Sequence, residues 1–493
     1  MTQHKQASIK INFIMNFILT VSSFIFPIIT FPYISRTLLP LGTGRIAFAT
    51  SVASYATMLG MVGIPTYGIR AVARVRNQQR ELNKTVQEIF FFNAITTLGA
   101  LALYLVSIAL VPRFAEDKTL FLINGVGIVF NLFGMEWLYR GLEQYRYITV
   151  RSIAFKCLSL VLMFLLVHST SDYLIYGGIL VFATVGANVL NFIHARHYIS
   201  FKLEPNLEIW RHFFPALQFF LMAVATTIYT SLDSVMLGMM IGKEAVGYYD
   251  AAIKIKNILI SLVTALGGVL LPRLSHYIQT EQHEAFKRVT RKAFAFVCFA
   301  SIPLSTYFIA MAEPAILFLS KEQFLPSVFP MQLVMPTIVL IGLSNLLGIQ
   351  ILLPLGKERV VLSSVCWGAV LNFGLNLVLI PSWGVAGAAF STLLAELLVT
   401  IYQAWYLRDQ LREMVVLADL GKIGLATVLA TLSTFLFRHW ISPFWTLALS
   451  ASVFGLIYLA ILWFSREQFV SYLGQMALGF LKRRKVWLSA PIY

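Results

Sequence analysis

Several charged side chains lie inside otherwise apolar segments of this sequence. Asp233 occurs in TIYTSLDSVMLG with no partner in its own segment, and Asp250, Lys254 and Lys256 share the next apolar segment. A charge inside a membrane helix costs about 2.5–3.5 kcal/mol on insertion scales, so such residues mark ion or substrate pathways. We expect Asp233 and Asp250 to be ion-coupling residues and the two lysines to line a cationic cavity. The structural alternative is an Asp250–Lys254 ion pair, four residues apart, beside one lysine that snorkels to the interface.

Two further charged positions lie near the ends of apolar segments. Glu136 and Arg140, four residues apart in EWLYRG, predict a structural ion pair on one helix, and Glu136 is also a third ion-coupling candidate. Arg36 stands where the first apolar segment ends. It is a candidate for substrate binding, with snorkelling of its side chain to the interface as the alternative.

The sequence gives no sign of a metal or cofactor site. Cys157, Cys298 and Cys366 are odd in number and lie within apolar segments, so they predict neither a disulfide framework nor a CxxC metal site. The nucleotide-binding string G-x-x-x-x-G-K-[ST] does not occur. We therefore expect no cofactor and no metal, and no connection is long enough to house a catalytic domain.

Long apolar runs must position these charges. The 493 residues are 58% hydrophobic and 12% charged, with a mean hydropathy of +0.77, whereas soluble domains carry about 25% charged residues. Runs of this length predict membrane-spanning helices, because they are too long and continuous for barrel strands. We predict an all-α integral membrane protein with about fourteen spans, at residues 11–35, 46–69, 88–111, 119–139, 150–168, 174–195, 214–240, 248–271, 293–313, 329–353, 360–380, 384–407, 422–438 and 443–464.

Basic residues alternate between successive connections. Twenty-eight of the 38 lysines and arginines lie in one set of connections and near both ends of the chain. The other set holds seven: Arg36, Arg45, Arg113, Lys118, Lys243, Lys321 and Arg438. The positive-inside rule places both termini in the cytoplasm. The basic stretch from Arg466 predicts an interfacial helix on anionic lipid, so the net charge of +16 indicates membrane lipids and not nucleic acid as partners.

The chain contains an internal repeat. At an offset of 203 residues Gly44 corresponds to Gly247, Arg70 to Arg273, and the string QRELNK from Gln79 to QHEAFK from Gln282. Six spans per repeat leave both copies in the same orientation, which gives two lobes around a central cavity, as in alternating-access transporters. We predict an N-lobe at 1–205, a C-lobe at 206–415, and two extra C-terminal helices with a basic tail at 416–493. Arg70 and Arg273 join the substrate-binding candidates, and a chance match of two basic loops is the alternative.

Three strings resemble a known family. EWLYRGLEQYRYITVRS from Glu136, TIYTSLDSVMLGMMIGKEAVGYYDAAIKIKN from Thr227 and LIPSWGVAGAA from Leu379 are together similar to bacterial polysaccharide repeat-unit flippases. These belong to the multidrug/oligosaccharidyl-lipid/polysaccharide exporter superfamily. The resemblance runs from about residue 10 to 465. Arg140 departs from the family pattern, which often has glutamine there.

The resemblance implies export of an undecaprenyl-pyrophosphate-linked oligosaccharide across the bacterial cytoplasmic membrane. Such a flippase breaks no bond and is not an enzyme, and its expected partners include a polysaccharide polymerase and glycosyltransferases. A cationic pocket suits pyrophosphate, and interior aromatic side chains suit sugar rings. A peptidoglycan-precursor (lipid II) flippase shares the architecture and stays open as an alternative. A drug/cation antiporter of the superfamily would need an acidic cavity, whereas deep lysines outnumber deep acids here.

Overall fold

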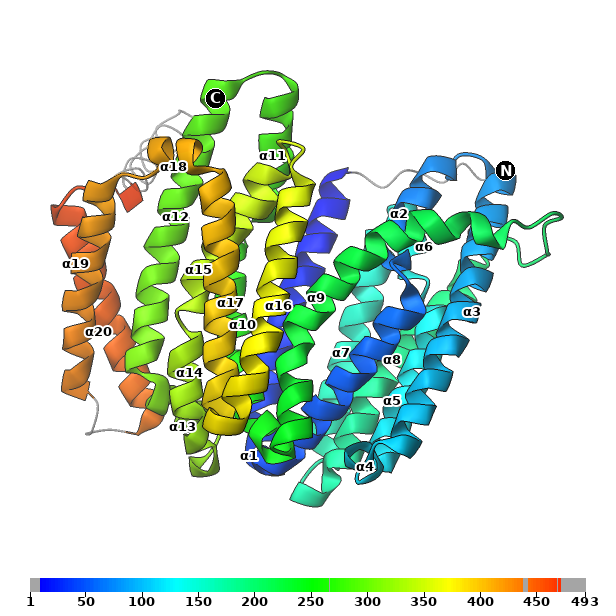
Figure 1. The fold of residues 1–493 in the computed structure, drawn as a ribbon, viewed down its shortest axis with the longest axis horizontal. Coiled ribbons are helices and arrows are strands. Elements are labelled where there is room, and N and C mark those ends of the chain that lie inside the picture. Colours follow the sequence, from blue (N-terminus) through cyan, green and yellow to red (C-terminus); the bar gives the residue numbers. More distant parts are fainter. Residues whose placement is uncertain (1–8, 266, 438–441, 468, 471–493) are drawn as a thin grey trace, which may run out of the picture. The chain divides into compact units, whose positions relative to one another are not determined.

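The computed structural model describes residues 9–265, 267–437, 442–467 and 469–470. These residues form helices joined by short connections, and none of them lies in a β-strand (Figure 1). Ten described helices are long and apolar enough to cross a membrane. The number rises to twelve if Ile209–Ile228 with Thr230–Met240 and Glu322–Val334 with Thr337–Leu352 each count as one bent span. The predicted all-α membrane architecture is confirmed.

Helices α1 and α10 explain why at most twelve described helices qualify as spans, whereas the sequence predicts fourteen. Helix α1, Ile9–Met61, covers the first predicted span and most of the second, and it kinks at Leu39, where the backbone has φ 59° and ψ 179°. Helix α10, Lys243–Thr264, occupies most of the eighth predicted span. The charges of Asp250, Lys254 and Lys256 interrupt its apolar sequence and lower its hydropathy. Fewer helices qualify as spans than predicted because α1 joins two predicted spans across one kink and α10 carries three charged side chains.

The chain folds into two compact units. The described parts of Met1–Ala251, Leu319–Phe324 and Leu375–Ala388 form the first unit, and those of Ala252–Phe318, Leu325–Gly374 and Ala389–Tyr493 form the second. In the first unit α1 is the central element, because it packs against most of the other long helices. Its neighbours are α3 (Gln79–Leu110), α5 (Lys118–Asn131), α7 (Tyr145–Leu166), α8 (Tyr173–Ala195) and α9 (Phe213–Met240).

A reciprocal contact joins the turn of α1 to the beginning of α10. A Cβ added to Gly44 would fall on the backbone of Lys243 and Gly247, and one added to Gly247 would fall on the backbone of Pro40. Only glycine allows two backbones to approach this closely. The offset of 203 residues turns Pro40 into Lys243 and Gly44 into Gly247, so the two halves of this contact correspond under the repeat predicted from the sequence.

Ion pairs link three connections at the end of the first unit where α1 contacts α10. The Lys243 ammonium lies 2.9 Å from Glu116 and 2.5 Å from Asp117, and the Arg45 guanidinium lies 3.6 Å from Asp117. Lys243 is 7% exposed. Its hydrogen bond and charge lower the pKa of the Glu116 carboxyl. These four residues come from three connections that the charge pattern predicts on one side of the membrane.

The segment that joins α8 to α9 is bound along α3. The Gln87 side-chain amide donates to the carbonyls of Ser200 and Lys202, at 3.0 and 2.6 Å. Further along, the buried Glu88 carboxylate accepts a hydrogen bond from the backbone N–H of Glu208, forms an ion pair with Arg211, and lies within hydrogen-bond distance of His212 Nε2, at 3.0 Å. This connection is therefore an ordered strap on the first unit.

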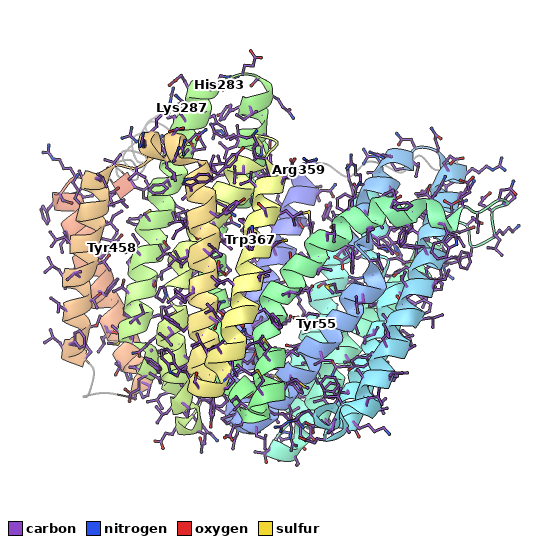
Figure 2. All side chains as sticks on the ribbon, in the orientation of Figure 1. Tyr55, His283, Lys287, Arg359, Trp367 and Tyr458 are labelled. Carbon is purple, nitrogen blue, oxygen red and sulfur yellow. The ribbon has the colours of Figure 1, made fainter. Side chains whose placement is uncertain are left out.

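The second unit ends in a helical pair. Helix α19, Leu417–Thr434, packs against α20, Pro443–Phe464, and also against α12, His283–Ala310 (Figure 1). The Tyr458 hydroxyl of α20, labelled in Figure 2, donates to the Phe299 carbonyl of α12 at 2.8 Å. The predicted interfacial helix and basic tail lie almost entirely within 471–493, outside the described residues.

The remaining helices complete the two units. They are α2 (Ile64–Val75), α4 (Pro112–Ala115), α6 (Glu136–Gly141), α11 (Gly267–Gln279), α13 (Ala312–Leu319), α14 (Val328–Val334), α15 (Thr337–Ser344), α16 (Glu358–Trp383), α17 (Val385–Tyr406) and α18 (Arg408–Met414). Between α15 and α16, a π-helical stretch covers Asn345–Leu352.

Candidate functional site

Asp233 lies in a buried polar cluster of the first unit. Its side chain belongs to α9, and the residue is 6% exposed. The Tyr249 hydroxyl of α10 donates to Oδ2, and the Asn376 amide of α16 donates to Oδ1 at 2.6 Å. Tyr249 and Asn376 are buried as well. Three helices therefore converge on one carboxylate.

These two hydrogen bonds stabilise a negative charge on Asp233. Hydrogen bonds to a carboxylate are stronger than those between neutral groups, and both of these donors are neutral. Tyr55 of α1, labelled in Figure 2, lies within electrostatic reach of Asp233. Its hydroxyl is buried and finds no hydrogen-bond partner among the described residues.

The two lysines of the eighth predicted span follow the cluster along α10. Lys254 is half-buried and Lys256 is 8% exposed. Asp250 is half-buried on the same helix. One helix thus carries a hydrogen-bond donor to Asp233 and, further along, two cationic side chains in largely apolar surroundings.

The other candidates of the first unit do not join Asp233. Arg36 is exposed at the end of the first half of α1, where its Nε donates to the Ser320 carbonyl at 3.2 Å. Arg70 is exposed on α2. Glu136 and Arg140 form the predicted ion pair on α6, with 2.6 Å between Oε1 and Nη2.

Arg273, in the second unit, is exposed on α11. Its Nε donates to the Tyr277 hydroxyl at 2.7 Å, and its guanidinium lies 5.6 Å from the centre of that ring. The local contacts of this arginine are thus with its own helix.

Sequence reasoning missed the partners of Asp233. Tyr249 lies 16 residues away and Asn376 lies 143 residues away, so no local pattern joins them. A signal was present, because the Asn376 amide interrupts the apolar string LNFGLNLVL, and polar side chains inside a span usually serve packing or function. Nothing in the spacing links that amide to the seventh span.

The fold defines the class of protein, a polytopic helical membrane protein. Residues 9–278 match the family model described as "Polysaccharide biosynthesis protein", and residues 158–457 match the one described as "Lipid II flippase MurJ". The first match alone covers more than half of the chain. The chain belongs to the polysaccharide biosynthesis protein family, within the exporter superfamily that its sequence resembles.

Curated relatives agree with this assignment. A "Putative O-antigen transporter" of Escherichia coli (strain K12) is 24% identical over 409 residues, which cover 82% of this chain and 97% of the relative. A protein of the same name from Shigella dysenteriae is 24% identical over 405 residues, covering 80% of this chain and 98% of the relative. Both relatives are named as transporters and the matched families are those of flippases and polysaccharide biosynthesis proteins, which confirms the prediction of a transporter rather than an enzyme.

Solved structures share the fold. The lipid II flippase MurJ in an inward closed conformation has a TM-score of 0.74 at 16% identity, covering 91% of this chain and 98% of that chain. An inward-facing multidrug resistance MATE family transporter has a TM-score of 0.54 at 13% identity, covering 78% of this chain and 98% of that one. At these identities the likeness shows the fold alone.

Proposed function

We propose that this protein is a flippase that moves an undecaprenyl-pyrophosphate-linked oligosaccharide repeat unit across the bacterial cytoplasmic membrane. The observation that carries the proposal is the match to relatives named as O-antigen transporters along 97% and 98% of their lengths. The chemistry of α10 supports it, because Lys256 is 8% exposed within a helix of largely apolar residues. Charged residues within a membrane span mark substrate or ion pathways, and a lysine suits a pyrophosphate-bearing substrate.

The proposed cavity wall consists of Lys254 and Lys256, with Arg36, Arg70 and Arg273 as further contacts to the substrate along its path. Seven residues make almost two helical turns, so Lys256 and Tyr249 share one side of α10. Asp233, Asp250 and Glu136 are the proposed ion-coupling residues. Of these, Asp233 has the strongest support, because its carboxylate is buried and held by donors from two other helices.

We propose fourteen spans in two six-span repeats, with an N-lobe at 1–205, a C-lobe at 206–415 and two additional C-terminal spans. The reciprocal contact of Gly44 with Lys243 and of Gly247 with Pro40 supports the repeat, because its two halves correspond under the offset of 203. Both termini are proposed to be cytoplasmic. Alternating access would then require the turn of α1 and the beginning of α10 to separate at the extracytoplasmic side.

A second function, lipid II flipping, is favoured by one specific observation. The chain matches the MurJ family model over 158–457 and shares the MurJ fold. Lipid II is also an undecaprenyl pyrophosphate linked to sugars, so both substrates present the same anionic group to α10. The two functions differ in the sugar and not in the pyrophosphate chemistry.

Deletion and complementation test the proposed function in cells. Loss of the gene should stop surface polysaccharide assembly and leave lipid-linked repeat units on the cytoplasmic leaflet, and the wild-type gene should restore export. The expected partners, a polysaccharide polymerase and glycosyltransferases, predict that their genes act in the same assembly process. Depletion that arrests peptidoglycan synthesis and leaves surface polysaccharide intact would favour lipid II and contradict the proposal.

A further inference from the structure

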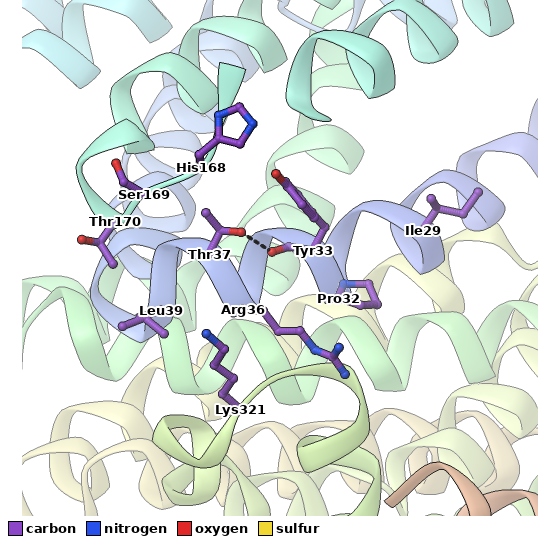
Figure 3. A pocket seen from close by; sticks show the side chains of 10 residues that line it. All are labelled: Ile29, Pro32, Tyr33, Arg36, Thr37, Leu39, His168, Ser169, Thr170 and Lys321. Atoms are coloured by element: carbon purple, nitrogen blue, oxygen red, sulfur yellow. Dashed lines mark hydrogen bonds between the residues drawn. The ribbon is translucent and has the colours of Figure 1, made fainter. Parts of the chain in front are cut away.

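A cationic cavity of about 630 Å³ lies within the first unit (Figure 3). Its walls come from the part of α1 that leads up to the kink at Leu39, from the connection that follows α7, and from Lys321. In Figure 3 the residues His168, Ser169 and Thr170 lie on one side of α1, and Lys321 lies on the other. All three segments belong to connections or span ends that the charge pattern predicts on the extracytoplasmic side.

Hydrogen bonds from α1 hold both flanking segments in place. The Tyr33 hydroxyl donates to the Val167 carbonyl at 2.6 Å and fixes the connection on one side. On the other side the Ser35 hydroxyl donates to the Leu319 carbonyl at 2.9 Å. The next residue, Arg36, donates from Nε to the Ser320 carbonyl at 3.2 Å. These contacts place Lys321 next to Arg36.

The connection that follows α7 is also internally ordered. The backbone N–H groups of His168 and Ser169 donate to one carboxylate oxygen of Asp172, at 2.9 and 2.8 Å. That carboxylate therefore caps the loop. The hydroxyl-bearing side chains of Ser169 and Thr170 line the cavity.

The charges of the lining residues indicate which kind of ligand the cavity binds. Arg36 and Lys321 are positive, and none of the ten described lining residues is acidic. Arginine and lysine together bind phosphate oxygens well, because their hydrogen bonds are charge-assisted. Ile29 and Pro32 add an apolar wall, and Ile25 and Ile28 of the same helix are exposed. An anionic group attached to a hydrocarbon chain fits this combination.

We propose that this cavity binds the phosphate group of a membrane lipid at the extracytoplasmic end of the first unit. The pyrophosphate of the translocated substrate and the phosphate of a phospholipid share this chemistry. If the ligand is the translocated substrate, the cavity is a release site that holds the headgroup after passage, and this part rests on the function proposed above. Arg36 then acts after translocation and not in a central cavity.

A cysteine placed in the cavity reports binding locally. The full-length protein, with its three native cysteines replaced by alanine, carries Thr37→Cys beside Arg36 and is treated with a polar maleimide. Undecaprenyl pyrophosphate, phosphatidylglycerol or diacylglycerol is added at increasing concentration. We expect phosphate-bearing lipids to protect Cys at 37 from labelling and diacylglycerol not to protect it. Protection by undecaprenyl pyrophosphate at much lower concentration identifies the substrate, and equal protection by phosphatidylglycerol identifies phospholipid.

Matched variants connect the protection to the two cations. Combining Arg36→Gln with Lys321→Gln should raise the protecting concentration by about tenfold or more, because each removes a charge-assisted hydrogen bond. Lys118→Gln, an exposed cation outside the cavity, should leave it unchanged. Absence of protection, protection by diacylglycerol, or equal protection in the double variant would overturn the proposal. Export by the Thr37→Cys protein is measured separately, so export without protection rejects the cavity and retains the function.

Discussion

At the residue scale, the structure changes the view of Asp233 from an isolated acid to the acceptor of a three-helix cluster. Its carboxylate accepts from Tyr249 and Asn376, both neutral. A site held in this way is pre-organised, because the donors are themselves buried and fixed by packing. Its charge is also costly in an apolar core, which is the reason to assign it a task beyond structure.

Replacing Asp233 by asparagine tests that task. Asp233→Asn keeps the shape and can still accept from Tyr249, so the folded protein should reach normal levels. We expect the rate of polymer export to fall by about tenfold or more, because interactions of a charged group are worth about 1.5–3 kcal/mol. The measurement is surface polysaccharide at matched protein abundance. Asp419→Asn is the control, since Asp419 is another buried acid, paired with Lys422 on α19, and belongs to no proposed site. Full export by Asp233→Asn would remove the charge from the mechanism.

At the element scale, the contact between α1 and α10 has no room for any side chain. Gly44 and Gly247 each face backbone atoms of the other segment, and backbone cannot move aside as the tip of a long side chain can. The turn also includes Leu39, whose φ of 59° is costly for a residue with a side chain. Ion pairs of Lys243 with Glu116 and Asp117 surround the same contact.

Alanine at either glycine should destabilise the protein by a similar amount, because the contact is reciprocal. Gly44→Ala and Gly247→Ala each overpack the junction, which typically costs about 1–3 kcal/mol, and should lower the melting temperature of the purified protein. Gly99→Ala on α3 is the matched control, since a Cβ there meets nothing within 4 Å. Alanine is the better helix former, so this control should melt at the same or a higher temperature. Equal melting temperatures for all three variants would contradict the reciprocal contact.

At the scale of the whole molecule, the orientation in the membrane is a prediction from the distribution of basic residues. Ser171 and Lys321 lie in connections predicted outside, and Gln79 and Gln282 in connections predicted inside. All four side chains are exposed, so cysteines at these positions are accessible to reagent. An impermeant maleimide added to intact cells should label positions 171 and 321 and spare 79 and 282. Labelling at 282 from outside would overturn the topology.

The membrane potential should drive the transport cycle in part. The pyrophosphate moves outward from a negative interior, and return of an empty cavity with Lys254 and Lys256 charged moves positive charge inward. Each charge gains about 2.3 kcal/mol per 100 mV across the full membrane, less whatever Asp250 and Asp233 neutralise. In proteoliposomes without ion gradients the flipping rate should rise with potential. Combining Lys254→Gln with Lys256→Gln should weaken that dependence, while Lys118→Gln should not. A rate indifferent to potential would contradict this account.

Hydropathy predicted the helical spans because each apolar run by itself favours transfer from water into the membrane. The breaks within them depend on tertiary contacts. At Met135 the backbone adopts φ 42° and separates α5 from α6, although the sequence there contains no proline. Depth identified Asp233, but its donors Tyr249 and Asn376 come from other helices. The sequence predicts Arg36 as a binding residue. Lys321 lines the same cavity only because its connection folds against α1, where Arg36 donates to the Ser320 carbonyl, 284 residues away in sequence.

Flipping by the purified protein tests the central claim most directly. The full chain is reconstituted in liposomes with a fluorescent undecaprenyl-pyrophosphate-linked oligosaccharide of the host's own repeat unit, and in parallel with fluorescent lipid II. Accessibility of each headgroup to an external quencher measures its transfer. The account predicts rapid transfer of the repeat-unit lipid, loss of transfer in Asp233→Asn, and slower transfer of lipid II. Transfer of lipid II alone, or of neither lipid by protein that is folded, would contradict it.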